Sequence, residues 1–166
     1  MSSIYKLPYF EEIDLNENEE YYASEFEYRD HIISIDLNLD DIEGKISKSK
    51  LDKVKNFLDN IDTPYTNALI AIQKKYKDVE NCDYFDQHLK ELEASDLNQL
   101  LSKADKSLSE REQLISVLYL TTIGFYPYSN KPFATFDFTI GEDLTNWLVV
   151  VDFNNKGEIY YITEES

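Results

Sequence analysis

The sequence is poor in the residues that cross-link small folds or interrupt regular structure. Only one of its 166 residues is cysteine, Cys82, so the chain can form no internal disulfide and offers no cysteine-based zinc framework. This usage is typical of a reducing compartment. Glycine and proline number four each, which excludes low-complexity chains and glycine-rich phosphate-binding loops.

Basic residues are also scarce: 16 Lys and Arg stand against 33 Asp and Glu, a net charge of −17. Residues 1–44 carry a net −11 and residues 79–166 a net −10, whereas residues 45–78 carry a net +4. Nucleic acids and anionic membranes are bound through Lys and Arg, so neither is an expected partner. A basic protein is the expected partner, and acidity that serves solubility alone is the alternative interpretation.

Long hydrophobic runs are absent as well. The most apolar stretches, residues 114–120 and 147–151, are far shorter than the roughly 20 residues that span a bilayer. The N-terminal residues lack the basic and apolar regions of a signal peptide. We therefore expect a cytoplasmic protein with no membrane partner. The sequence specifies no oligomeric state.

Aromatic residues are abundant, with 13 Tyr and 9 Phe, and they bury large areas in a core. The length suits one domain, residues 1–166. Apolar periodicity predicts strands within residues 7–39, helices within 49–101 and strands within 113–163. The expected fold is α+β: an antiparallel β-sheet with two to four helices packed on one face.

The first strands are predicted from period-two alternation. Residues 22–28 place aromatic side chains on one face, with Glu25 and Glu27 on the other. Arg29-Asp30 forms the expected turn to a second strand over residues 33–39. A further strand is expected over residues 9–15.

Helical spacing predicts four helices in the middle of the chain. Ser49 and Asp52 resemble a capping box for the first, Thr63-Pro64 begins the second, and Ser95 caps the fourth. A polar loop follows over residues 102–109. The remaining strands are expected over residues 114–123, 133–140, 147–153 and 159–163, the last two joined by a tight turn at residues 154–157.

The catalytic motifs tested are missing. There is no G-x-S-x-G nucleophile elbow, and the spacing of Cys82 and His88 does not place them on one helical face. His88 falls on the apolar stripe of a predicted helix and is interpreted as structural, and His31 is expected to be exposed after a turn. An enzyme is therefore not the preferred interpretation.

No metal or cofactor is predicted. The carboxylates that begin at Asp36 resemble a calcium loop, but an EF-hand requires Gly at position six and Glu at position twelve. Asp41 and Ser47 occupy those positions. Residues 37 and 39 are leucines, which indicates a strand instead.

Tyrosine among carboxylates in the N-terminal block suggests a surface that binds a partner. Tyrosine is a frequent binding hot spot, and complementary charge speeds encounter with a basic protein. The alternative is a solvated sheet face whose carboxylates prevent edge pairing. In the turn over residues 126–133, Tyr128 is a further candidate contact, with an ordinary loop as its alternative. The candidate residues are Glu19, Glu20, Tyr21, Glu25, Glu27 and Tyr128.

Several short segments together resemble an uncharacterised family of small acidic bacterial proteins. The family is similar in size, charge and α+β composition to the immunity proteins that accompany bacterial toxins, and the resemblance carries over no site residue. The segments that carry it are residues 6–10, 13–15, 35–38, 124–127, 136–141, 144–145 and 157–159.

These observations favour a non-enzymatic, acidic, protein-binding domain, interpreted as an immunity protein that occludes a basic toxin domain. Two alternatives stay open. One is a housekeeping or regulatory interaction domain, and the other is an enzyme that uses a carboxylate pair, with or without a metal.

Overall fold

The computed structural model describes residues 3–17, 19–40, 42 and 44–166. Five helices and eight strands lie within these ranges, which makes the fold α+β, as predicted. In chain order the elements are β1 (Ile4–Lys6), β2 (Glu12–Asp14), β3 (Tyr21–Tyr28), β4 (His31–Asn38), α1 (Lys48–Asp59), α2 (Asp62–Tyr76), α3 (Asp83–Glu91), α4 (Ala94–Leu100), α5 (Glu110–Ser116), β5 (Tyr119–Phe125), β6 (Ala134–Thr139), β7 (Leu148–Phe153) and β8 (Ile159–Glu165).

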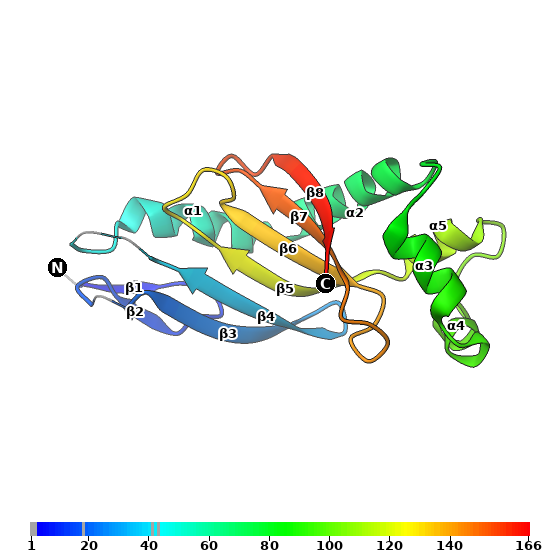
Figure 1. Ribbon diagram of the computed structural model, residues 1–166. Helices are drawn as coiled ribbons and strands as arrows, with labels where there is room; N and C mark the ends of the chain where they lie inside the picture. The colour runs from blue at the N-terminus through cyan, green and yellow to red at the C-terminus, as the bar shows by residue number, and fades with distance from the viewer. Residues whose placement is uncertain (1–2, 18, 41, 43) are drawn as a thin grey trace.

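The main sheet has six strands in the order β3-β4-β5-β6-β7-β8 (Figure 1). Neighbouring strands are antiparallel except β4 and β5, which are parallel. The predicted sheet is therefore mostly antiparallel, with one parallel pair that the sequence did not reveal. A parallel pair needs a long crossover, and here the connection from β4 to β5 contains all five helices of the described chain.

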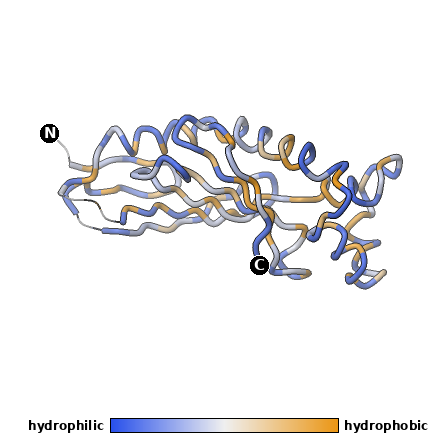
Figure 2. Tube along the Cα trace, turned by 45° about the horizontal axis from the view of Figure 1, so that its top comes forward, coloured by the Kyte–Doolittle hydropathy of each residue, from blue (hydrophilic) through white to orange (hydrophobic). Residues whose placement is uncertain are grey.

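One face of the sheet is covered by α1 and α2, which run along it in Figure 1. Phe57 of α1 lies edge-on to three phenylalanine rings of the sheet region and tilted against a fourth, that of Phe133, at centroid distances of 5.4 to 6.1 Å. Tyr65 of α2 contacts Tyr28 of β3 and Phe138 of β6. Hydrophobic and hydrophilic residues alternate along the strands in Figure 2, and β4 and β6 bury every second residue on the side that faces these helices.

The predicted pattern of the first hairpin is confirmed. In β3, Phe26 is buried while Glu25 and Glu27 are exposed. Arg29 and Asp30 both have positive φ, 49° and 68°, as a two-residue turn of type I′ requires. The predicted turn before β8 is also present, with Gly157 at φ 78°.

The N-terminal segment differs from the single strand expected over residues 9–15. It forms two three-residue strands, β1 and β2, that pair only with each other. Tyr9 adopts a positive φ of 69°, which ends extended structure there, and its ring stacks on Phe26 at 4.0 Å. The Tyr5 hydroxyl donates to Asp52 of α1 at 2.6 Å. The hairpin therefore extends the layer that covers the helix-side face.

The prediction of two to four helices was too low, because α5 occupies the start of the strand expected over residues 114–123. Ser109 caps α5 by accepting from the Glu112 backbone N–H at 3.1 Å, and its hydroxyl also contacts the Glu112 carboxylate at 3.3 Å. Ser109 and Glu112 have the S-x-x-E spacing of a capping box, which is a sequence signal for a helix start at this position. Leu114 and Ile115 are buried on the helix, and the strand begins only at Tyr119.

Two predicted helix starts were also displaced. The N-cap of α1 is Ser47 rather than Ser49, and that of α4 is Glu93 rather than Ser95. Neither cap residue accepts a side-chain hydrogen bond from its helix. No helix within the described ranges is both long enough and apolar enough to cross a bilayer.

Helices α3, α4 and α5 gather beyond one end of the sheet (Figure 1). The Arg111 guanidinium of α5 forms a two-pronged ion pair with Asp86 of α3, at 2.7 and 3.0 Å, and holds the pKa of that carboxyl below its usual range. Glu164 of β8 accepts from the Tyr84 backbone N–H at 2.6 Å, at the first turn of α3. These contacts tie the helices to the sheet.

Candidate functional site

The face of the sheet opposite α1 and α2 is acidic. The six strands of the main sheet contain seven carboxylates and no Lys or Arg. Only Glu164 points to the helices, where it contacts α3. The other six share the opposite side, here called the acidic face: Glu25, Glu27, Asp36, Asp137, Asp152 and Glu165.

Strand register brings these residues together. Asp137 of β6 pairs with Thr122 of β5, which pairs with Ser34 of β4 and so leads to Glu25 of β3. The neighbouring row joins Asp36 to Asp152 through Gly124 and Thr135. Residues that pair across strands point to the same side of a sheet. Carboxylates from five of the six strands therefore meet on one surface.

Asp137 is the most perturbed carboxyl of the acidic face. It is half-buried, and burial is the main cause that raises its pKa to about 7. Repulsion from Glu165, Asp36 and Asp152 acts in the same direction. Burial also raises the pKa of Asp36, although the amide of Asn38 donates to that carboxylate at 2.5 Å. At neutral pH, part of the population therefore carries a proton on Asp137.

Aromatic and polar groups complete this surface. Tyr126 lies beside the carboxylates, and its pKa is raised first by burial and then by their charges. Its ring approaches the backbone so closely that a Cβ at Gly124 would lie 3.2 Å from the Tyr126 hydroxyl and 3.4 Å from an Asp36 carboxylate oxygen. The Thr135 hydroxyl donates to Asp152 at 2.8 Å. Gly124 thus lets a tyrosine ring lie against the acidic face.

Over β3 and β4 the acidic face is hollowed into a shallow groove of about 540 Å³. Its lining residues are Tyr21, Ala23, Ser24, Glu25, Ser34, Ile35 and Asp36. Tyr21 is 56% exposed and Ile32 of the next strand is 61% exposed, so apolar area lies beside the carboxylates. The combination offers both charge and contact area to a ligand.

The structure groups some of the predicted site residues and separates one. Tyr21, Glu25 and Glu27 are exposed on the same side of β3, and Glu19 and Glu20 are exposed just before this strand. Tyr128 lies on the helix side instead. Its hydroxyl accepts from the Ser47 backbone N–H at 2.8 Å, and its ring lies 5.7 Å from the Lys50 ammonium nitrogen.

Sequence reasoning missed four residues of the acidic face: Asp36, Asp137, Asp152 and Glu165. A signal was present for Asp137, because it alternates with the buried Phe136 and Phe138 and so had to occupy the other side of its strand. Which carboxylates meet depends on strand order and register, and the parallel pairing of β4 with β5 is not encoded in local periodicity.

The histidines and the cysteine do not belong to the acidic face, although the Cys82 sulfur lies 4.0 Å from the carboxylate of Glu164 on the helix side. His88, interpreted from the sequence as structural, is buried, with its Nε2 2.8 Å from the Thr145 hydroxyl and its Nδ1 2.5 Å from the Tyr84 carbonyl oxygen. His31 is half-buried rather than exposed, because it stacks on Tyr119 at 3.8 Å. Cys82 is buried, and burial raises its thiol pKa.

Within the described ranges, no group of three or more His, Cys, Asp and Glu side chains is placed to hold a metal ion. Asp36 lies in β4, as the strand interpretation predicts, whereas Asp41 lies outside the described residues.

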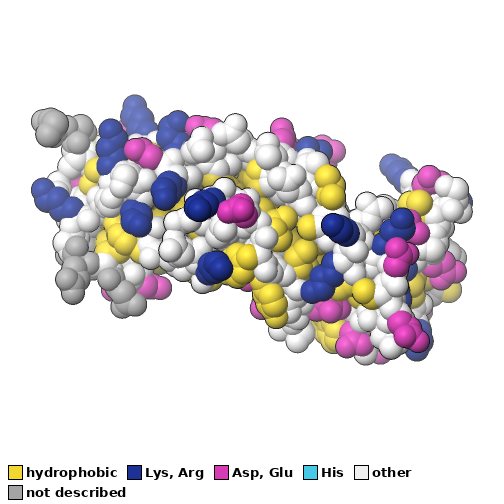
Figure 3. Space-filling model, turned by 90° about the horizontal axis from the view of Figure 1, so that it is seen from above, with side chains coloured by type: hydrophobic (Ala, Val, Ile, Leu, Met, Phe, Trp, Pro, Cys, Tyr) yellow, Lys and Arg dark blue, Asp and Glu magenta, His cyan; other side chains and the backbone are white. Residues whose placement is uncertain are grey.

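The helical layer carries charge of the opposite sign. Lys48, Lys50, Lys53 and Lys55 lie on α1, and among the described residues only Lys55 of these pairs with a carboxylate, that of Asp59 at 2.8 Å. Figure 3 views the molecule from above and shows Lys and Arg side chains gathered on its left half, where α1 lies in Figure 1. The fold thus separates a basic helical layer from the acidic face.

Comparisons with known proteins identify no family for the chain. No protein-family model, no curated protein and no solved structure matches the chain. The resemblance to a family of small acidic bacterial proteins therefore stays a prediction.

Proposed function

We propose that the chain is a non-enzymatic binding domain whose acidic face receives a basic protein. The observation that carries this proposal is Asp137, a half-buried carboxyl surrounded by other carboxylates on strands that contain no Lys or Arg. Such a cluster opposes its own ionisation until a cation arrives. Lys or Arg from a partner provides that cation.

The proposed mechanism couples charge to contact area. A guanidinium or ammonium group placed near Asp137 favours the ionised form, so binding releases a proton at neutral pH. Charges at the rim, including Glu25 and Glu27, speed the encounter, and Tyr21 and Tyr126 contribute contact area. Within this class, we propose the immunity-type role, in which the acidic face covers a basic cleft of a toxin in the cytoplasm.

The test is capture of partners by the tagged protein in its source cells, with elution along a salt gradient. The variant E25Q/E27Q/D36N/D152N removes four charges from the acidic face. The matched control E91Q/E93Q/D96N/E110Q removes four charges from exposed positions on or next to α3, α4 and α5. We expect one stoichiometric basic protein from wild type and from the control, and at least tenfold less from the acidic-face variant.

Two results would contradict the proposal. A partner that the acidic-face variant retains fully would place the binding surface elsewhere. A partner that stays bound in high salt and is not basic would favour a regulatory interaction domain whose acidity serves solubility. Released protons, measured by calorimetry in buffers of different ionisation enthalpy, test the role of Asp137 separately.

A further inference from the structure

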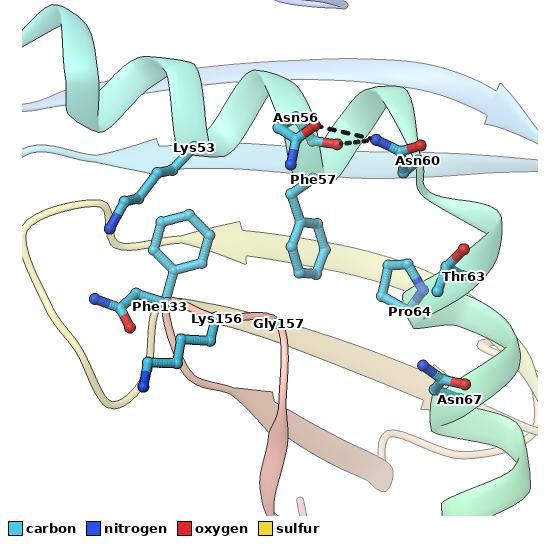
Figure 4. A pocket seen from close by; sticks show the side chains of 11 residues that line it. Lys53, Asn56, Phe57, Asn60, Thr63, Pro64, Asn67, Phe133, Lys156 and Gly157 are labelled. Atoms are coloured by element: carbon cyan, nitrogen blue, oxygen red, sulfur yellow. Dashed lines mark hydrogen bonds between the residues drawn. The ribbon is translucent and has the colours of Figure 1, made fainter.

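A cavity of about 380 Å³ opens on the helix side of the sheet, away from the acidic face. It lies between α1, the start of α2 and the turn that joins β7 to β8 (Figure 4). Its volume falls in the range of small-molecule sites and exceeds the room that a few waters need. The lining residues are Lys53, Asn56, Phe57, Asn60, Thr63, Pro64, Asn67, Phe133, Asn155, Lys156 and Gly157.

The chemistry of this lining is unlike that of the rest of the chain. It contains two lysines and four asparagines and no Asp or Glu, although 33 of the 166 residues are acidic. Among the described residues, neither Lys53 nor Lys156 has an ion pair or a side-chain hydrogen bond, whereas Lys55, on the same helix, is paired with Asp59. The two unpaired ammonium groups therefore favour an anion.

The wall of the cavity is apolar and rigid. Phe57 is 9% exposed and is held by four surrounding phenylalanine rings, and Phe133 is 1% exposed. Pro64, in the first turn of α2, continues this wall in Figure 4. Aromatic walls that cannot rearrange suit a flat, unsaturated body, which packs on them without loss of side-chain freedom.

The polar groups are divided between the two ends. In Figure 4, Lys53 and Lys156 reach toward the end near Phe133, and Asn60, Thr63 and Asn67 lie at the other end. The Asn60 amide is fixed by donation to the Asn56 carbonyl oxygen at 2.8 Å and to the Asn56 side chain at 3.2 Å. The exposed Asn67 side chain makes no hydrogen bond to another described residue, so its amide is available to a ligand.

We propose that this cavity binds a small aromatic carboxylate. The carboxylate lies between the ammonium groups of Lys53 and Lys156, and the ring packs against Phe57 and Phe133. A polar substituent at the far end of the ring hydrogen-bonds Asn67. The site uses neither the residues nor the sign of charge of the acidic face, so it stands independently of the proposed protein partner.

The test is a titration of the whole protein, followed by amide chemical shifts. The probes are 2-naphthoate, its neutral analogue 2-naphthamide, cyclohexanecarboxylate and inorganic phosphate. We expect 2-naphthoate to cause saturable shifts around residues 53–67 and 155–157. Its dissociation constant should be at least tenfold lower than those of the other three probes. The flat ring and the charge are both needed for that preference.

Variants distinguish binding in the cavity from a general attraction of anions to lysine side chains. K53M/K156M should remove the preference for 2-naphthoate over 2-naphthamide. N67L should weaken the binding of both probes, because leucine fills the far end of the cavity. The matched control K48M/K74M removes two exposed lysines outside the cavity and should bind as wild type does. Urea unfolding of each variant confirms that it is folded.

Three outcomes overturn the proposal. The first is equal binding of 2-naphthoate and 2-naphthamide. The second is equal weakening by K48M/K74M and K53M/K156M, which would reduce the site to a diffuse basic surface. The third is competition by inorganic phosphate or by an acidic peptide at the affinity of 2-naphthoate, which would show that the apolar wall takes no part.

Discussion

The pKa of Asp137 is raised to about 7, so the acidic face can be tested at a single residue. Because its pKa is raised from 3.8 to about 7 in the folded protein, the folded state binds a proton more tightly than the unfolded state does. This carboxyl therefore favours folding least above pH 7, and its penalty develops as the pH rises from about 4 to about 7.

We expect D137N to match wild type in stability near pH 4 and to exceed it by about 1 to 3 kcal/mol at pH 8. Urea unfolding at both pH values measures the difference. A smaller fall with pH should persist in the variant, because burial also raises the pKa of Asp36. D105N is the control of opposite sign, since Ser107 lowers the pKa of that carboxyl by donating to it. Equal gains at pH 4 and pH 8 would contradict the assignment.

The sequence predicted which side a residue faces wherever the periodicity of its own strand or helix was enough to decide it. The exposure of Glu25 and Glu27 followed from period-two alternation, and the position of His88 on the apolar stripe of its helix followed from helical spacing. The position of Tyr128 did not follow, because it depends on a contact with Ser47, 81 residues away in the sequence. Residues such as Asp137 acquire their properties from neighbours on other strands, which local patterns do not specify.

At the scale of elements, β8 shows how adjacent residues can have opposite effects. Glu164 accepts from the first turn of α3, while Glu165 lies on the acidic face and raises the pKa of Asp137. A carboxylate at a helix N-terminus is favourable, and a carboxylate beside other carboxylates is not. One strand therefore supplies a helix cap on one side and repulsion on the other.

We expect E164Q to lower the free energy of unfolding by about 1 kcal/mol, because the amide is a weaker acceptor for the Tyr84 N–H. E165Q removes the same charge from the next residue and should leave stability unchanged or raise it slightly at pH 8. Urea unfolding of the two variants side by side provides the measurement. Equal losses would show that Glu164 does not act as a cap.

The elements themselves were largely predictable, and the exceptions have physical causes. The sequence predicts one strand over residues 114–123 because a short apolar run fits a buried strand and a buried helix equally well. The helix forms here because the Ser109 hydroxyl caps α5 by accepting from the Glu112 backbone N–H. The strand order of the sheet was not predictable, because pairing of β4 with β5 joins residues almost 90 positions apart.

At the scale of the whole molecule, the net charge of −17 is divided unequally between two sides. Exposed charge pairs each contribute up to about 1 kcal/mol and are screened by salt. We expect the free energy of unfolding at pH 7.5 to rise by about 1 to 2 kcal/mol between 10 and 500 mM NaCl, because screening relieves repulsion.

The variant E25Q/E27Q/D36N/D152N should lose a larger part of that rise than E91Q/E93Q/D96N/E110Q, although each removes four charges. Urea unfolding at the two salt concentrations distinguishes them. Identical salt dependence would mean that the repulsion is spread over the surface instead of concentrated on the acidic face.

The single crossover between β4 and β5 also sets the order in which the chain can fold during synthesis. About 80 residues separate the two strands, so at roughly 5 to 20 residues per second the ribosome needs several seconds to reach β5 after β4 has emerged. Throughout that interval β4, the strand of the β3–β4 hairpin that later pairs with β5, has no partner on that edge. Glu25, Glu27 and Asp36 of the hairpin then act as gatekeepers that repel the same hairpin on neighbouring nascent chains.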